Sequence, residues 1–270
     1  MKNDSAIARE FLTRGRSETC PIIDMHGHYG TFSGIYFPNP FADRMLTSMD
    51  RAGVSAIVCS SHAGLCEQER GNREMAEVVK KHPGRIYGYR VINPNYPEAA
   101  RREVERYPQD SGFVGFKFHP SGHTYPITGE HYVPALEYAN EHRLLVLSHT
   151  WGNSQYDGPK LVAEVAAKYP NATIIMGHSG YGEWDVTFEV AREHGNVYLD
   201  LCAAYRLNGI VTRMVDEVGS HRIVFGTDQP WFGPHFCAGS VCFSRITDED
   251  RHNIFHRNAE KLMAPFRVSS

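Results

Sequence analysis

Two histidines, His26 and His28, lie one residue apart near the end of an apolar segment, IIDMHGHYG at residues 22–30. Alternate side chains of an extended strand point to the same face, so we expect both imidazoles to project together, with Met25 and Gly27 on the opposite face. Two adjacent imidazoles are costly to bury unless they are hydrogen-bonded or bind a cation. The pair therefore raises the question of a metal site.

Further polar side chains stand at the ends of other apolar segments: Lys117 and His119 in GFVGFKFHP, His149 in LLVLSHT, His178 in ATIIMGHS and Asp228 in RIVFGTDQ. Three imidazoles and one carboxylate are suitable ligands for Zn²⁺ and acceptable ones for Mn²⁺ or Fe²⁺. We therefore predict a single divalent ion, Zn²⁺ before the others, bound by His26, His28, His149 and Asp228. His178 would lie nearby as an acid, a base or a group that polarises a carbonyl.

Eight short apolar segments alternate with amphipathic segments that have the spacing of helices. The strands are expected at residues 21–28, 55–61, 85–93, 112–120, 144–150, 172–179, 196–202 and 222–229. Eight such units in 270 residues predict one α/β domain over residues 1–270, a (β/α)8 TIM barrel with its core at about 21–265. The rival is an open doubly wound sheet, but no glycine-rich phosphate loop follows the first strand.

The barrel explains how residues so far apart in sequence could meet. Catalytic residues of a (β/α)8 barrel lie at the C-terminal ends of its strands, which is where the polar side chains fall. The segment at 29–40, rich in glycine, proline and aromatic residues, is expected to form a loop over the mouth of the barrel. A last helix is expected over TDEDRHNIFHRNAEKLM, residues 247–263.

The composition excludes several classes of protein. The net charge is −3, with 41% apolar and 22% charged residues, so neither nucleic acid nor an anionic membrane is an expected partner. No apolar stretch approaches the ~18–20 residues that span a bilayer, and the N-terminus does not resemble a signal peptide. We expect a cytoplasmic protein whose six scattered cysteines are free thiols, mostly buried.

Five motifs, each at the end of an expected strand, resemble those of a known family. IDMHGH, GFKFHP, LSHT, MGHSG and FGTDQP are similar to the strand-end motifs of the amidohydrolase superfamily, and most similar to its amidohydrolase-related branch. The resemblance runs from about residue 21 to 265. It implies a TIM barrel of the metal-dependent hydrolase type, in which His26, His28, His149 and Asp228 hold one metal ion and His178 contacts substrate or metal-bound water.

The resemblance also leaves the number of metal ions and the reaction open. In some members of the superfamily a carboxylated lysine bridges two metal ions, and Lys117 occupies the matching strand. We favour one ion, with Lys117 as a substrate or neighbouring contact. The branch contains both metal-dependent hydrolases and nonoxidative decarboxylases of the aminocarboxymuconate-semialdehyde and resorcylate type.

Two reactions therefore compete. In the first, metal-activated water attacks the carbonyl of a small amide, ester or lactone, and Asp228 carries the proton. In the second, the metal orients a carboxylate that loses CO₂. An arginine at the end of the second strand would favour the decarboxylase, but that strand ends in CSSHAG, so we favour the hydrolase. A non-catalytic barrel is a minor alternative, because all the expected ligands are present.

The remaining expectations concern substrate contacts and assembly. The substrate is expected to be a small molecule, and homodimers are common among such barrels. Side chains near the metal motifs are expected to contact the substrate: His119, Trp151 and Arg206. For Arg206 the physical reason is that a guanidinium can hold a carboxylate by two hydrogen bonds.

Overall fold

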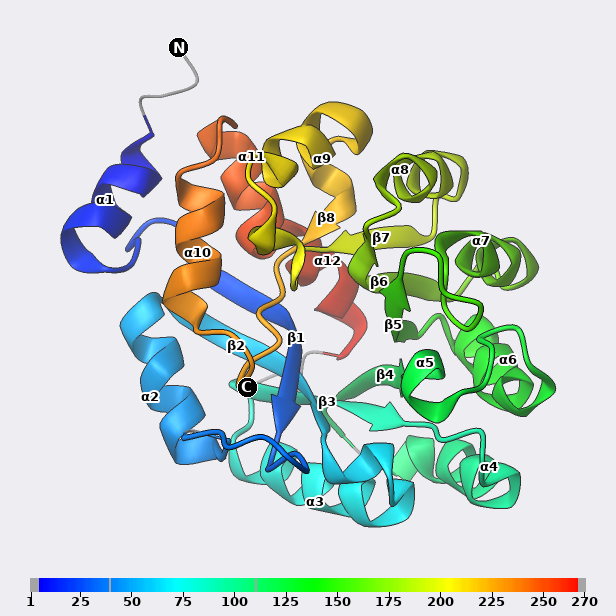
Figure 1. Cartoon of the computed structure of the whole chain (residues 1–270). Helices are drawn as coiled ribbons and strands as arrows, with labels where there is room; N and C mark the ends of the chain where they lie inside the picture. Colours follow the sequence, from blue (N-terminus) through cyan, green and yellow to red (C-terminus); the bar gives the residue numbers. More distant parts are fainter. Residues whose placement is uncertain (1–4, 39, 110, 267–270) are drawn as a thin grey trace.

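The computed structural model describes residues 5–38, 40–109 and 111–266. Its centre is one parallel sheet whose strands are hydrogen-bonded in the order of the sequence, with helices around the outside (Figure 1). The strands are β1 (Ile22–Tyr29), β2 (Val54–Ser61), β3 (Ile86–Val91), β4 (Phe113–Phe118), β5 (Leu145–Trp151), β6 (Thr173–Tyr181), β7 (Val197–Asp200) and β8 (Ile223–Val224). All eight expected strands are confirmed.

The main helices follow the strands, as a (β/α)8 barrel requires, except α1, which precedes β1. They are α1 (Ala6–Arg14), α2 (Ala42–Ala52), α3 (Gln68–Lys81), α4 (Pro97–Arg106), α5 (Pro120–His123), α6 (Val133–His142), α7 (Pro159–Lys168), α8 (Trp184–Glu193), α9 (Ile210–Val218), α10 (Pro234–Cys242), α11 (Asp248–His252) and α12 (Asn258–Met263). The expected last helix is present in three parts, because a π-helix at Asn253–Arg257 separates α11 from α12.

Backbone hydrogen bonds join the first strand to the chain that follows the last one. The Met25 N–H donates to the Phe225 carbonyl at 2.8 Å, and the His28 N–H donates to the Gln229 carbonyl at 2.7 Å. A parallel bridge also pairs Gly27 with Gln229. An open sheet would leave both edges unpaired, so these contacts exclude the doubly wound alternative.

The apolar core has two layers. Side chains inside the barrel form one cluster, which includes Ile23, Met25, Val58 and Leu147, and a larger cluster fills the space between the strands and the helices. The expectation that Met25 lies opposite the histidine pair is therefore wrong. The pairing register of β1 with β2 shifts between Asp24 and Gly27, and this irregularity turns Met25 and the following histidines to the same interior.

Local signals fix the ends of the elements. Gly53 ends α2 in the left-handed conformation with φ of 78°, and its N–H donates to the Met49 carbonyl. At the start of α11, Thr247 and Asp250 form a reciprocal capping box. In the described part of the chain no helix is long and apolar enough to cross a membrane. The six cysteines are free thiols, and all except Cys66 are buried, as expected.

Candidate metal centre and active site

His26, near the end of β1, is held by a carboxylate that the sequence analysis did not single out. Its Nδ1 lies 2.7 Å from Asp200 Oδ2, and both side chains are fully buried. Asp200 ends β7, and it also accepts hydrogen bonds from the backbone N–H groups of His178 and Cys202. An imidazole that donates Nδ1–H to a carboxylate keeps its Nε2 lone pair free for a cation.

The other two expected imidazole ligands have the same arrangement. His28 Nδ1 lies 3.2 Å from Ser60 Oγ, which comes from the end of β2. His149 Nδ1 lies 2.9 Å from Asp157 Oδ2, in the turn after β5. With a partner oxygen at each Nδ1, Nε2 is left as the ligand nitrogen, which is the orientation that second partners impose on metal-binding histidines.

The structure brings Asp228 to the histidine pair. Its Oδ1 lies 2.9 Å from His28 Nε2 and 3.5 Å from His26 Nε2, although about 200 residues separate them in sequence. Burial alone would raise the pKa of the Asp228 carboxyl, but His26, His178 and Lys117 outweigh it and lower that pKa. An ionised carboxylate thus faces two imidazole nitrogens. This donor set fits a divalent cation that prefers nitrogen and oxygen ligands.

Lys117, on β4, is buried beside the same nitrogen. Its Nζ lies 3.0 Å from His26 Nε2, so the amine and a cation would compete for one lone pair. Burial lowers the pKa of Lys117, which eases release of its charge when a cation arrives. Lys117 is therefore placed to lie beside a single metal ion. It is also close enough to this site to contact a second metal ion.

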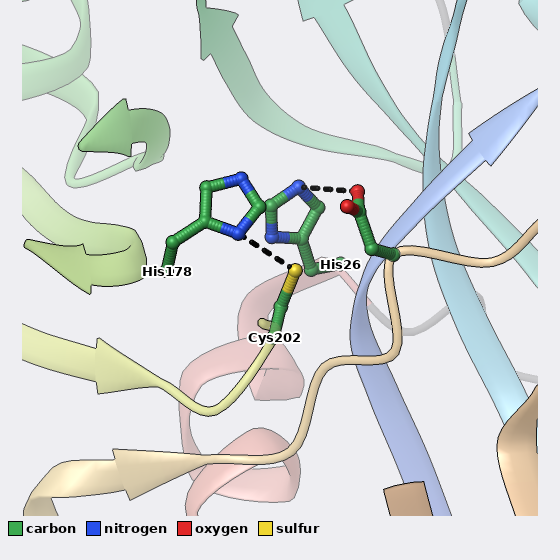
Figure 2. A group of neighbouring side chains, drawn as sticks. His26, His178 and Cys202 are labelled. Carbon is green, nitrogen blue, oxygen red and sulfur yellow. Dashed lines mark hydrogen bonds and ion pairs between the residues drawn. The ribbon is translucent and has the colours of Figure 1, made fainter. Parts of the chain in front are cut away.

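His178 and Cys202 approach the centre from β6 and the residues after β7 (Figure 2). The Cys202 Sγ lies 3.0 Å from His178 Nδ1, and burial raises the pKa of this thiol well above its usual range. One ligand atom each from His26, His178, Cys202 and Asp228 lie within 4.8 Å of one another. His178 is therefore part of the centre, as expected, and Cys202 is an addition to it.

A cavity of about 220 Å³ opens onto these groups. Its lining comprises His28, Phe32, His62, Leu65, Lys117, His119, His149, His178, Asp228 and Trp231. The His119 ring stacks on that of His149 with centroids 4.3 Å apart, so His119 lies where a substrate contact was expected. Phe32 comes from the loop after β1, which covers part of the barrel mouth as expected.

His62 and Trp231 form one wall of the cavity. The Trp231 Nε1–H donates to His62 Nε2 at 3.1 Å, while His62 Nδ1 lies 2.8 Å from the Gly30 carbonyl. Both nitrogens of His62 are therefore occupied, and burial lowers its pKa. His62 is a neutral ring that stacks on His28 with centroids 4.6 Å apart, and it positions Trp231 rather than binding a cation.

Two expected substrate contacts lie outside the lining of this cavity. Arg206 is exposed, and its guanidinium lies over the Tyr181 ring at 5.8 Å. Trp151 stacks on Tyr181 with centroids 4.7 Å apart, and its ring reaches the site through His149 at 6.0 Å and His178 at 5.8 Å. Arg206 lies beyond the end of β7, where side chains no longer follow the alternation of a strand, and the pairing register of β5 with β6 shifts between His149 and Trp151.

The sequence analysis missed three residues that hold the centre together. Asp200 and Cys202 end the seventh expected strand, and their alternation on its inner face was a usable signal. Asp157 lies in an irregular turn, where no periodicity reveals the direction of a side chain. Close packing also requires a glycine at position 226, because a Cβ on Gly226 would lie 1.9 Å from Asp200 Oδ1.

Known proteins of similar sequence include two decarboxylases. A gamma-resorcylate decarboxylase from Polaromonas sp. is 24% identical over 271 residues, which cover 82% of each chain. A gamma-resorcylate decarboxylase from Rhodococcus jostii is also 24% identical, over 280 residues that cover 82% of this chain and 83% of that protein.

Solved structures show the same fold. The 2,6-dihydroxybenzoate decarboxylase from Rhizobium superimposes with a TM-score of 0.75 at 18% identity, covering 91% of this chain and 99% of that one. A dihydroxybenzoic acid decarboxylase from Polaromonas sp., solved with bound manganese and the inhibitor 2-nitroresorcinol, gives a TM-score of 0.74 at 21% identity, covering 92% and 98%. The amidohydrolase family model matches residues 23–263, nearly the whole barrel. This protein therefore belongs to the amidohydrolase family.

Proposed function

We propose that this protein is a metal-dependent nonoxidative decarboxylase of a small hydroxylated aromatic carboxylate. The observation that carries the proposal is the pairing of a nitrogen and oxygen donor set with a small cavity walled by aromatic rings. The likeness along 82% of the chain to gamma-resorcylate decarboxylases supports the same reaction. The sequence alone favours a hydrolase, whereas the likeness to these relatives supports the decarboxylase.

The size of the cavity suits one substituted ring. A dry cavity of ~150 Å³ holds benzene, so about 220 Å³ leaves room for a carboxylate and hydroxyl groups. The Phe32 and Trp231 rings meet edge to face with centroids 5.3 Å apart and offer a flat apolar wall to a planar substrate.

Hydrolysis was favoured because no arginine stands at the end of the second strand. The lining of the cavity weakens that reason. Among the described residues that line the cavity, the cationic side chain is Lys117 rather than an arginine. Its Nζ lies beside the donor set, where it can face a carboxylate. A bound divalent cation would add positive charge there and hold the carboxylate and a neighbouring hydroxyl oxygen. The donors that would hold this cation are His26, His28, His149 and Asp228.

Asp228 is placed to carry the proton. Its lowered pKa keeps the carboxylate ionised, so that it can accept the proton of a substrate hydroxyl and return it to the ring carbon that bears the carboxylate. The bond between that carbon and the carboxylate then breaks, its electron pair stays on the ring, and CO₂ leaves. When His178 Nδ1 accepts a hydrogen bond from the Cys202 thiol, Nε2 carries the ring proton. This Nε2–H could then donate a hydrogen bond that orients a substrate oxygen.

The test compares both reactions on metal-loaded enzyme. Protein loaded with Mn²⁺ or with Zn²⁺ is assayed against 2,6-dihydroxybenzoate, 5-carboxyvanillate and a panel of lactones and amides, with CO₂ release and acid release recorded separately. We expect CO₂ from an aromatic acid and, in D₂O, one deuterium on the product carbon. Acid release from a lactone or amide without CO₂ from any aromatic acid would establish the hydrolase instead.

Other parts of the biological setting remain proposals of the same kind. We propose that the protein acts in the cytoplasm on a small molecule, without a nucleic acid or membrane partner, and that it forms a homodimer. Light scattering on purified protein tests the assembly, and a mass of one chain at working concentration would contradict it.

A further inference from the structure

A second group of metal-binding side chains lies away from the active-site cavity. One ligand atom each from Cys20, His252 and His256 lie within 4.8 Å of one another. Cys20 comes two residues before the start of β1, whereas His26 and His28 lie toward its other end. Cys20 is buried and the two histidines are half-buried, so a small cation could reach the group from solvent.

The ring orientations bring one nitrogen of each imidazole together inside this group, where they share a hydrogen-bonded proton that a cation would replace. His252 Nδ1 lies 2.9 Å from His256 Nε2. On the other side of the second ring, His256 Nδ1 lies 3.2 Å from Glu260 Oε1, an ion-pair contact without the geometry of a hydrogen bond. This carboxylate adds negative charge next to the ring, which favours a cation at the group.

The spacing of the histidines also suits a shared cation. Two histidines four residues apart on a helix face are a recurrent zinc-binding arrangement. Here the second lies within the π-helix Asn253–Arg257, and single π-helical turns are frequent at functional sites. Tetrahedral zinc with Zn–N near 2.0 Å needs its two nitrogens roughly 3.3 Å apart, which is close to the 2.9 Å separation present.

The charges around the group do not oppose a cation. Two arginines approach Cys20, but each is paired with a carboxylate: Arg251 with Asp248 at 3.1 Å, and Arg257 with Glu249. Burial raises the pKa of the Cys20 thiol to about 12, so the thiol holds its proton at neutral pH and would release it on binding a metal.

We propose that Cys20, His252 and His256 form a second metal site, which binds Zn²⁺ through one thiolate and two imidazole nitrogens. Three protein ligands leave the fourth position to water. The site would join the segment before β1 to the helices at the end of the barrel, ligands more than 230 residues apart in sequence. Its role is therefore structural. It is independent of the reaction proposed for the strand-end centre, the group formed by His26, His28, His149 and Asp228.

Cobalt provides the direct test, because a thiolate bound to Co²⁺ gives a charge-transfer absorption in the near ultraviolet. The full chain is stripped of metal with a chelator and titrated with Co²⁺. The comparison is made in Cys202→Ser, which removes the thiol of the centre formed by His26, His178 and Asp228. We expect the absorption in Cys202→Ser and its loss when Cys20→Ser is added to that variant.

His256, one of the two half-buried histidines, supplies a second variant in case Cys20→Ser does not fold. His256→Gln keeps an amide near the position of Nε2 but binds transition metals poorly, so we expect one equivalent less zinc per chain by elemental analysis. At about 100 times the dissociation constant, Zn²⁺ should raise the melting temperature by about 5 °C through this site, and the variant should lose that increment.

The outcomes separate this proposal from the proposed reaction. Decarboxylation in His256→Gln should match that of the unchanged protein, since His256 does not line the cavity. A thiolate absorption that persists when Cys20→Ser is added to Cys202→Ser, or equal zinc content in His256→Gln and the unchanged protein, would overturn the second site. Failure of every substrate in the decarboxylase assay would leave the cobalt and zinc results unaffected.

Discussion

Asp200 Oδ2 lies 2.7 Å from His26 Nδ1, within the closed interior of the barrel. This contact joins the last residue of β7 to β1, the first strand of the barrel. It fixes which nitrogen of His26 faces the metal centre. The orientation of His26 therefore depends on a residue 174 positions away in sequence.

The first prediction concerns this contact. Asp200→Asn can no longer hold the Nδ1 proton of His26 as a charged acceptor, so we expect metal affinity at the strand-end centre to fall by about 10–100-fold. Chelator competition on the purified protein measures the affinity. Asp185→Asn, which changes an exposed carboxylate paired with Arg213, is the control and should leave the affinity unchanged. An unaltered affinity in Asp200→Asn would show that the contact does not orient His26.

The second prediction concerns His178 and Cys202, which we expect to act as one unit. His178→Asn should lower kcat by about 10²-fold or more if its Nε2–H orients the substrate. Cys202→Ala should lower kcat less, and the loss in the double variant should be smaller than the sum of the two single losses, because the thiol contacts both His178 and Asp228 of the same centre.

The control for this pair is His142→Asn, an exposed histidine outside the cavity, which should keep full activity. Cys202→Ser should restore most of the activity that Cys202→Ala loses, since a hydroxyl can donate the same hydrogen bond. Additive losses in the double variant would contradict the coupling.

The third prediction separates one metal ion from two. If Lys117 is an amine beside a single ion, Lys117→Met removes a buried competing charge and should tighten metal binding by roughly tenfold. If a carboxylated Lys117 bridges two ions, the same variant should lose one equivalent of metal. Elemental analysis in the His256→Gln background removes the zinc expected at the second site, and Lys168→Met is a surface control.

The fourth prediction is a pH dependence of stability. Burial raises the pKa of the Asp24 carboxyl to about 7, although hydrogen bonds from Thr227 and from the His26 N–H oppose the shift. In the unfolded chain the carboxyl releases its proton near pH 3.8, so between these values the folded state binds more protons. The free energy of unfolding contributed by Asp24 therefore falls as pH rises from about 4 to 7 and is constant above.

Asp24→Asn removes this term while keeping an oxygen for the two backbone N–H donors. The free energy of unfolding of the variant minus that of the unchanged protein should therefore increase with pH up to about 7, by at most about 4 kcal/mol. Urea unfolding of metal-free protein between pH ~5 and ~8 measures the difference. A difference independent of pH would show that Asp24 does not hold its proton in the folded state.

The sequence by itself determined the barrel and much of its chemistry. Alternating apolar segments fixed eight strands, because burial of a strand and burial of a helix face impose different periods on apolar residues. The strand ends then placed His26, His28, His149, His178 and Asp228 at one rim, since parallel strands of a barrel all end on the same face.

Only the tertiary structure decided what surrounds these side chains. Asp200, Asp157 and Cys202 act through contacts with residues far away in sequence, and no local pattern reports such a contact. Arg206 lies outside the cavity lining, because the direction of a side chain in a loop depends on what packs against it. Trp151, the last residue of β5, contacts His149 and His178 without lining the cavity. The pairing of Cys20 with His252 and His256 likewise appears only when the end of the chain returns to its beginning.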